Sequence, residues 1–527
     1  MSKNIKTRGI IPRRLKGFRD IDALTNELRW HIIKNAETVY KQYGFEHWDT
    51  PILEYVECLG KHMPPETGQA SAVQDGVFHF QNLEFEPVCA EDGTELKDAD
   101  RNTIMERFDV LLRYDLTAPL ARRIAETLWQ RKMQRQLQPA GVPLFRRYQY
   151  GPVYRLEAKL EPGRFREFWQ LDFDTVGTND YTTDAECCMI LADALQAIGL
   201  NHQKFTVKVN NRKILKGLLQ MHNITTEQAE ADILRVIDKL DKIGLENVKS
   251  ELSNGRKDAS GSMVKGLGLP DATVQAISGF FAQYAQINKN RKAVLQSLSQ
   301  QLAQSSIAAE GIAELQAMDA VWCALNYTDD LIVFDPSFVR GMAYYTGPIF
   351  EVEAHLQVTD EKGQPKRFGS IAGGGRYDTL VAKLLNIAVP AVGASIGVDR
   401  LGELLLLSGT IKDKLKGPVF IAVLDAALMP QYQKMAQNLR QNGIITEVYY
   451  GIQRKIQRQL EYADKRNCPV AILVGSNEIE RGVVTIKDLF LGAQTNTITD
   501  KQTWMQQVQR EVPLTDLVET VKEMLSS

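Results

Sequence analysis

The sequence predicts an α+β protein in which a mainly antiparallel sheet is interrupted by a helical insertion and followed by a small parallel α/β domain. Strand-like runs on both sides of the middle of the chain are joined by short turns, which are too short for parallel crossovers. Residues 205–326 have mostly helical periodicity, and strands alternate with helices after Lys416. We therefore expect the sheet in residues 1–204 and 327–412, the insertion at 205–326 and the last domain at 417–527.

Composition excludes disordered and membrane-spanning proteins. The 527 residues are 44% hydrophobic and 24% charged, which suits about three folded domains. The chain has no apolar run long enough to span a bilayer, and its basic start lacks the apolar core of a secretory signal. We expect a cytoplasmic protein with no membrane partner.

Cysteine and histidine usage argues against a metal centre built from these residues. The six cysteines include no CxxC pair and the seven histidines are scattered, so neither a zinc site nor a Ser/His/Asp triad is expected. A net charge of -2 means that any contact with nucleic acid must come from local basic patches.

The first segment of the predicted sheet begins with a long helix. Residues 21–43 place apolar side chains at helical spacing, and Gly44 follows as a stop signal. The strand-like run FEHWDTPILEY comes next, and its Pro51 indicates a sheet edge or a bend. In LLRYDLTAPLARRIAE a short strand passes through residues 115–117 into a helix that begins near Pro119. The Asp and Thr of this passage, considered alone, are expected to cap the helix.

The stretch YRLEAKLEPGRFREFWQLDFD, residues 154–174, predicts a hairpin. Strand-like runs at 148–157 and 165–176 flank a loop at 160–163. Side chains alternate between the two faces of a strand, so one face of the second arm should carry Trp169, Leu171 and Phe173. The opposite face should carry Arg166, Phe168, Gln170, Asp172 and Asp174. A ring among such groups can stack on a planar heterocycle, but a salt-bridged surface hairpin is an equally good interpretation of this stretch alone.

Arginines in and around this hairpin indicate phosphate binding. A guanidinium group matches phosphate oxygens bidentately, as Arg155 and Arg164 would, and a carboxylate such as Glu157 can hold Mg2+ beside phosphates. GASIGVDRL places Arg400 at the start of a helix, where the N-terminal end favours phosphate. VRGMAYYTG puts Arg340 beside a glycine, and AGGGRYD either approaches a ligand closely or forms a tight bend. No GxxxxGK[ST] motif and no GxGxxG in a strand-turn-helix context occurs, so arginines on an antiparallel sheet are the predicted ATP site.

Together these segments resemble the class II aminoacyl-tRNA synthetases, and in particular the histidyl-tRNA synthetase family, over nearly the whole chain. FEHWDTPILEY resembles class motif 1, the dimer-interface element, while the predicted hairpin is similar to motif 2 and GASIGVDRL to motif 3. VRGMAYYTG and AGGGRYD resemble the histidine signatures, which are far more specific, and PRRLKGFRD resembles the family's opening element. The resemblance implies a class II catalytic domain, an anticodon-binding domain at 417–527 and a homodimer. It implies that the ligands are L-histidine, ATP, Mg2+ and tRNA(His).

The resemblance also implies roles for single residues in binding ATP. Arg155, Arg164 and Arg400 would grip the phosphates, and Phe168 would stack on adenine. Glu157 would lie near adenine or hold the metal.

A histidine pocket is implied as well, with the members Asp115, Leu116, Thr117, Gln170, Asp174, Tyr344 and Tyr345. Asp115, Thr117 and Gln170 would accept hydrogen bonds from the substrate ammonium group, which can only donate. Asp174 and Tyr345 would read the imidazole, while Leu116 and Tyr344 would line the pocket.

The implied catalytic residues are Arg340 and Arg155. Arg340 would lie against the substrate carboxylate and the α-phosphate and would offset charge in the transition state of adenylate formation, an effect of about 3 to 4 kcal/mol. Ala343 departs from the family pattern, because many members carry an acid there. This departure concerns support of the two adjacent tyrosines rather than the arginine.

The last domain carries a predicted helix at 452–466 with basic residues away from its apolar side. Such a patch suits an RNA backbone, and the resemblance implies that Arg454, Lys455 and Arg458 contact tRNA.

Two other functions fit parts of the same resemblance. A non-catalytic regulatory paralogue would bind histidine-pathway enzymes, but such paralogues usually lack the last domain and the catalytic arginine. A class II synthetase for another amino acid, such as threonine, proline or glycine, would share the last domain. It would not share the histidine signatures or the pair Asp174 and Tyr345, which suits an imidazole.

Overall fold

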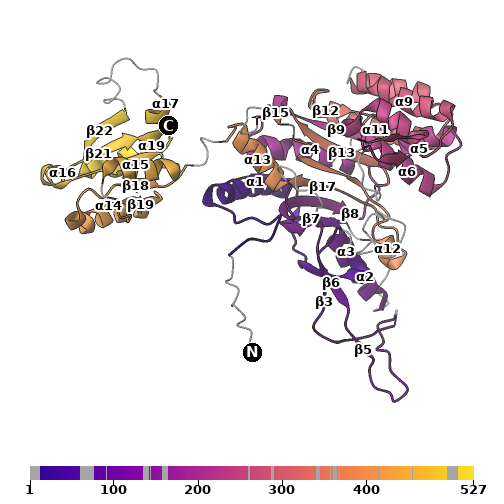
Figure 1. The fold of residues 1–527 in the computed structure, drawn as a ribbon, viewed down its shortest axis with the longest axis horizontal. Helices are drawn as coiled ribbons and strands as arrows, with labels where there is room; N and C mark the ends of the chain where they lie inside the picture. The colour runs from indigo at the N-terminus through magenta and orange to yellow at the C-terminus, as the bar shows by residue number, and fades with distance from the viewer. Residues whose placement is uncertain are drawn as a thin grey trace, which may run out of the picture. The chain divides into compact units, whose positions relative to one another are not determined.

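The chain forms two compact units, Met1–Thr410 and Ile411–Ser527 (Figure 1). The computed structural model describes residues 12–59, 76–90, 92–133, 142, 144–156, 164–258, 261–286, 290–339, 345–356, 358–359, 365–366, 368–411, 416–453, 455–494 and 508–526. Four residues with a predicted role, Glu157, Arg340, Tyr344 and Arg454, lie outside these described residues.

A large mixed sheet organises the first unit (Figure 1). Its eight strands are, in spatial order, β1 (Glu46–His47), β7 (Phe145–Tyr154), β8 (Glu167–Val176), β17 (Ala391–Gly397), β16 (Ala372–Arg376), β13 (Pro348–Ala354), β9 (Phe205–Asn211) and β12 (Ile332–Phe334). The two outer pairings, β1 with β7 and β12 with β9, are parallel, and all the pairings between them are antiparallel. The predicted mainly antiparallel sheet is confirmed.

The first unit also contains helices and short strands outside the large sheet. Its described helices are α1 (Ala23–Gln42), α2 (Val56–Leu59), α3 (Thr117–Met133), α4 (Thr182–Ile198), α5 (Arg212–Met221), α6 (Glu227–Ile237), α7 (Leu240–Ile243), α8 (Leu245–Leu252), α9 (Asp271–Gln286), α10 (Arg291–Gln301), α11 (Ser306–Ala324), α12 (Ala382–Leu385) and α13 (Val398–Leu407). Its short strands are β2 (Leu53–Tyr55), β3 (His79–Gln81), β4 (Glu86–Pro87), β5 (Met105–Glu106), β6 (Asp109–Leu112), β10 (Gly255–Lys257), β11 (Met263–Lys265), β14 (Val358–Thr359) and β15 (Pro365–Lys366). None of the helices in the described part of the chain is both long and apolar enough to cross a bilayer.

Strands β7 and β8 form the predicted hairpin, with Tyr154 paired to Glu167 next to the connecting loop. Phe173 on the apolar face is fully buried, and its ring centroid lies 4.8 Å from that of Tyr40 in α1. Helices α1, α4 and α13 pack against one another or against β8 and β17. The helices therefore cover the apolar face of β8, and the polar face is directed away from them.

The carboxylate of Asp399, in the first turn of α13, joins three distant segments. It accepts from Arg19 Nη2 at 2.7 Å, from Arg29 Nη2 at 3.1 Å and from the backbone N–H of Trp169 at 2.6 Å. The Arg29 guanidinium also lies 4.6 Å from the centroid of the Trp169 ring. The N-terminal helix, β8 and the start of α13 are thereby fixed to one another.

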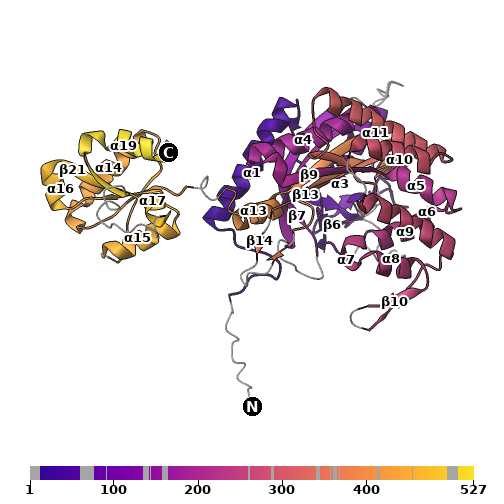
Figure 2. The same cartoon turned by 90° about the horizontal axis from the view of Figure 1, so that it is seen from above.

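Residues 205–326, expected to be a helical insertion, are not helical throughout. Phe205–Asn211 form β9, which pairs along β13 inside the large sheet, so the helical segment begins only with α5. Helices α5 to α11 gather on one side of the first unit (Figure 2); α5 and α11 contact β9, α10 contacts β12, and α11 packs back on α4 and α5. The sequence FTVKVNN is short and rich in β-branched residues, so it belongs to the sheet. Assignment of the helices to a separate insertion stays a prediction.

The second unit has a five-stranded sheet in the order β19 (Thr446–Val448), β18 (Val419–Ile421), β20 (Val470–Leu473), β21 (Val483–Asp488) and β22 (Gln509–Pro513). Its described helices of more than one turn are α14 (Met429–Gln441), α15 (Ile456–Lys465), α16 (Ser476–Arg481), α17 (Leu489–Gln494) and α19 (Leu517–Ser526). The expectation of a parallel sheet holds for the first three strands only, since β21 and β22 pair antiparallel. Residues 474–482 between β20 and β21 are too few for a parallel crossover.

Candidate active site

Two adjoining cavities lie over β8, β16 and β17. The larger has a volume of about 240 Å³, and the polar and aromatic groups that line it include Arg155, Arg164, Phe168, Gln170 and Arg400. The smaller, about 80 Å³, is lined among others by Asp115, Thr117, Asp172, Asp174, Tyr345 and Tyr377. Arg155, Gln170, Gly373 and Ser395 line both, so the two cavities share a wall.

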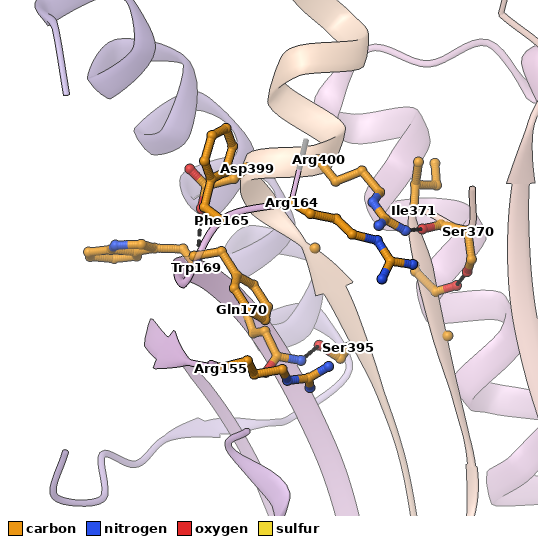
Figure 3. A pocket seen from close by; sticks show the side chains of 14 residues that line it. Arg155, Arg164, Phe165, Trp169, Gln170, Ser370, Ile371, Ser395, Asp399 and Arg400 are labelled. Carbon is orange, nitrogen blue, oxygen red and sulfur yellow. Dashed lines mark hydrogen bonds between the residues drawn. The ribbon is translucent and has the colours of Figure 1, made fainter. Parts of the chain in front are cut away.

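The larger cavity is basic and contains a ring suited to stacking. Arg155, Arg164 and Arg400 reach it from three elements: the end of β7, the segment before β8 and the first turn of α13 (Figure 3). Arg155 donates from Nε to Tyr114 O at 3.0 Å, and its guanidinium lies 5.3 Å from the Phe168 ring centroid. Arg400 donates from Nη1 to Ser370 O at 2.9 Å. Three guanidinium groups around one hollow suit a polyanion, and the ring suits a flat base.

Glycines bring the backbones of β16 and β17 close to the smaller cavity. A Cβ atom on Gly393 would lie 2.1 Å from Asp174 Oδ1, and one on Gly375 would lie 2.7 Å from the Tyr345 ring. The glycines of the AGGGRYD run lie in strand β16, where Gly375 makes room for the Tyr345 phenol, while Gly393 of β17 makes room for the Asp174 acid. The sequence left open whether this run would approach a ligand or form a bend.

The smaller cavity is acidic. Asp174 is 2% exposed; its Oδ2 lies 2.9 Å from Arg147 Nη2, and its Oδ1 accepts from the Tyr377 hydroxyl. Burial raises the pKa of Asp174, and the Arg147 guanidinium offsets part of that shift. Asp115 is also buried, and its Oδ1 accepts from the Ala118 N–H at 2.9 Å, so that it does cap α3 as expected. Two buried carboxylates at a cavity wall suit a cationic or N–H-donating ligand.

A third buried acid, Asp172, lies between these groups. It is 2% exposed, and its Oδ1 has no hydrogen-bond partner among the described residues. Gln170 Oε1 is likewise buried without a partner there, while Gln170 Nε2 donates to Ser395 Oγ at 2.7 Å. Burial, followed by the charge of Asp174, raises the pKa of Asp172 to about 8. The unsatisfied acceptor Gln170 Oε1 indicates a ligand that brings a donor, whereas the protonated carboxyl of Asp172 can meet a ligand through its O–H or its carbonyl oxygen.

We expect the stability of the protein to fall as the pH rises toward 8, because folding must keep Asp172 protonated. Its pKa is 3.8 for an ordinary aspartate and about 8 in the folded protein, so its favourable contribution is complete below pH 3.8 and is lost by about pH 8. One such group changes the free energy of unfolding by about 1 kcal/mol per pH unit. Urea denaturation at pH 5, 6.5 and 8 should show a smaller decline for Asp172→Asn than for the wild type. Equal declines in the two proteins would contradict the shift.

Family models and curated relatives show the family to which this chain belongs. Residues 109–401 match the family model described as "Histidyl-tRNA synthetase", and residues 418–524 match the model described as "Anticodon binding domain". The histidine–tRNA ligase of Ruegeria sp. (strain TM1040) is 41% identical over 514 residues, which cover 97% of this chain and 96% of that protein. The chain belongs to the histidyl-tRNA synthetase family.

Solved structures agree with membership in the histidyl-tRNA synthetase family. The crystal structure of histidyl-tRNA synthetase from Nostoc sp. PCC 7120 superposes with a TM-score of 0.67 at 28% identity, covering 98% of this chain and all of that one. A Bacillus halodurans structure, described as an ATP phosphoribosyltransferase regulatory subunit/histidyl-tRNA synthetase, has a TM-score of 0.59 at 20% identity, with 89% of this chain and 100% of that chain covered. At that identity the second likeness shows the fold alone. The predicted class II synthetase fold with an anticodon-binding domain is confirmed.

Within this family fold, most of the predicted histidine- and ATP-binding residues that the structure describes meet at the cavities. Leu116 is the exception: it is fully buried and lines neither cavity, and its carbonyl accepts from Arg147 Nη2 at 2.8 Å. Asp172, Tyr377 and Arg147 were not among the site residues predicted from the sequence. Asp172 and Tyr377 lie in motifs that were quoted, whereas Arg147 carried no signal until β7 and β8 were placed in register.

Among the described residues, neither cavity contains a group of side chains that could ligate a metal ion. The described residues include no group of three or more His, Cys, Asp or Glu positioned to hold an ion. Glu157, the predicted magnesium ligand, is outside the described residues. The described residues therefore do not form a metal site by themselves.

The predicted tRNA-binding residues belong to the second unit. Lys455 and Arg458 are exposed, and Arg458 Nη1 donates to Glu461 Oε2 at 2.7 Å. Tyr450 and Ile452, in the loop that follows β19, are 73% and 94% exposed. The exposed Tyr450 and Ile452 thus precede the exposed basic residues Lys455 and Arg458 along the chain.

Proposed function

We propose that the protein is a histidine–tRNA ligase, which joins L-histidine and ATP into histidyl-adenylate and then transfers the histidyl group to the 3' end of tRNA(His). The observation that carries this proposal is the shared wall between a basic and an acidic cavity. A nucleotide in the first and an amino acid in the second would meet at Arg155, where the α-phosphate and the carboxylate must react.

The larger cavity is proposed to hold ATP. Arg155, Arg164 and Arg400 supply bidentate donors for its phosphates, and Phe168 supplies a face for adenine. Mg2+ would be bound mainly by the phosphates themselves, as is usual for this ion, with Glu157 as the predicted protein ligand.

The smaller cavity is proposed to hold histidine. Asp115, Thr117 and Gln170 are the acceptors for the ammonium group, and the buried Gln170 Oε1 without a partner supports this part. Asp174 and Tyr345 are the proposed readers of the imidazole, since a carboxylate accepts from a ring N–H and a phenol bonds the other nitrogen. Leu116 would act through its backbone, and Tyr344 stays a proposed lining residue.

Two displacement steps would complete the reaction. First, a carboxylate oxygen of histidine bonds to the α-phosphorus while the bond to pyrophosphate breaks. Arg155 and Arg340 would stabilise the negative charge that develops there. Second, a ribose hydroxyl of the tRNA end bonds to the acyl carbon and AMP leaves.

Further parts of the proposal concern partners and compartment. Arg454, Lys455 and Arg458 are the proposed contacts to the tRNA backbone, with exposed Tyr450 available for stacking on an unpaired base. A homodimer through the motif 1 segment is supported by the exposed apolar side chains of Trp48, Ile52 and Leu53. A cytoplasmic location is supported by Cys187, Cys188 and Cys468, which are buried thiols outside any disulfide.

Exchange of labelled pyrophosphate into ATP tests the function directly. The purified chain, assayed with each of the twenty amino acids, is expected to support exchange with histidine alone, and charging of tRNA(His) should follow. Exchange with another amino acid would favour a class II synthetase of different specificity. No exchange with any would favour the regulatory paralogue.

A further inference from the structure

We infer that Arg147 is a positioning residue for histidine, which ties the acid that reads the imidazole to the segment that holds the ammonium group. This inference rests on the proposed function of the smaller cavity. Arg147 lines neither cavity, so it would act through the groups that it holds.

One guanidinium group bonds to both sides of the amino-acid pocket. Arg147 Nη2 lies 2.9 Å from Asp174 Oδ2 on β8 and donates to Leu116 O at 2.8 Å. Leu116 stands between Asp115 and Thr117, the two proposed ammonium ligands at the start of α3. Because Arg147 is fully buried, this bridge is shielded from water and salt.

The strand register explains why this arginine is in place. Arg147 of β7 is directly opposite Asp174 of β8, and Gly393 of β17 flanks the same acid on its other side. Cross-strand partners point to the same face of a sheet. The Arg147 side chain therefore contacts Asp174 from the β7 side, while Gly393 on the β17 side has no side chain that would occupy the space of the carboxylate. Arg147 Nη1 is itself held by Gln149 Oε1, and Gln149 exchanges hydrogen bonds with Thr50 at 3.1 to 3.2 Å.

The positive charge of Arg147 affects whether Asp174 is ionised and can accept a hydrogen bond from a ligand. Among the described residues, the groups whose pKa is raised by the charge of Asp174 are acids, phenols or thiols: Asp115, Asp172, Tyr377, Tyr40 and Cys187. Arg155 and Tyr345 line the same cavity. Asp174 in such surroundings would take up a proton unless a buried positive charge opposed it. Arg147 opposes the uptake of that proton and so favours the form of Asp174 that accepts from the imidazole N–H.

A double-mutant cycle tests this inference on the full-length chain. In histidine-dependent pyrophosphate exchange, Arg147→Met is expected to raise KM for histidine by about 100-fold and to leave KM for ATP within about 2-fold. In an Asp174→Asn background the same replacement should change KM for histidine by less than about 3-fold, because the acid that it serves is gone. Arg147→Lys keeps the charge but not the two-sided geometry, so an increase of about 10-fold is expected.

Arg113→Met is the matched control. Arg113 is also buried, at 3% exposure, but it donates to the carbonyls of Pro152 and Thr50 at 3.0 and 2.8 Å, and its guanidinium forms no ion pair with Asp115, Asp172 or Asp174. Its KM for histidine should stay within about 2-fold of the wild type. If Arg147→Met does not fold, KM for histidine is compared instead between the wild type and Arg147→Lys, and between Asp174→Asn and the doubly neutral Arg147→Met/Asp174→Asn variant.

Three outcomes would overturn the inference: equal factors in the two backgrounds, equal losses for histidine and ATP, or a control as impaired as Arg147→Met. Wild-type protein without histidine-dependent exchange would instead overturn the proposed function.

Discussion

Arg155→Ala is expected to lower kcat for histidine-dependent pyrophosphate exchange by about 1,000-fold. Arg155 lines both cavities, so its guanidinium lies where the α-phosphate and the histidine carboxylate would react. Fixed donors directed at charge that develops in a transition state contribute about 3 to 4 kcal/mol each. Because the additional negative charge around the α-phosphorus develops only in the transition state, kcat should fall more than either KM rises. Steady-state exchange kinetics with each substrate varied separately measures the division.

Arg146→Ala is the control for this prediction. Arg146 lies on the same strand, and there it pairs with Glu186 of α4 and stacks on Phe45 at 4.2 Å. It lines neither cavity, so a change of less than about 3-fold in kcat is expected. A loss in KM alone for Arg155→Ala would show that this arginine binds substrate and transition state equally.

Asp174→Asn is expected to raise KM for histidine by about 100-fold with little change in KM for ATP. The carboxylate is buried in the smaller cavity, where an amide in its place can direct a donor at the imidazole N–H and leaves Arg147 without a charge partner. Removing one member of a buried charge pair costs about 2 to 5 kcal/mol. Titration of exchange rates with histidine at saturating ATP, and the reverse, measures the two constants.

Asp193→Asn tests whether any carboxylate in this unit would give the same result. Asp193 accepts from the hydroxyls of Tyr43 and Tyr327 at 2.7 and 3.0 Å and lines neither cavity. Both KM values of this variant should match the wild type. An unchanged KM for histidine in Asp174→Asn would remove this acid from substrate recognition.

The polar face of β8 could be predicted from the sequence because strand periodicity is local. Alternation from Phe168 to Asp174 placed the ring, the amide and the acids on one face, and the structure has them around the two cavities. The role of Arg147 could not be predicted in this way. Its partner Asp174 lies on another strand, and a single sequence does not give the register that brings the two together.

Element boundaries were harder to predict than the face of a strand. Phe205–Asn211 was assigned to a helical region because helices follow it, although its place in the sheet depends on pairing with β13 far along the chain. The parallel sheet predicted for the last domain was wrong for β21 and β22, because the pattern of alternating strands and helices does not show that α16 is too short to return the chain to the same end. In both cases the decisive contact is remote or depends on length rather than on periodicity.

The position of Asp399 has a consequence for synthesis of the protein. The arginines that it binds were made 380 and 370 residues earlier, so α1 emerges from the ribosome long before its anchoring carboxylate exists. Contacts of such sequence separation are slow to form and leave apolar surface open to chaperones in the meantime. Nascent chains that stop before α13 should therefore pack α1 on α4 while Arg19 and Arg29 still lack their carboxylate partner, and synthesis of α13 then completes this part of the fold.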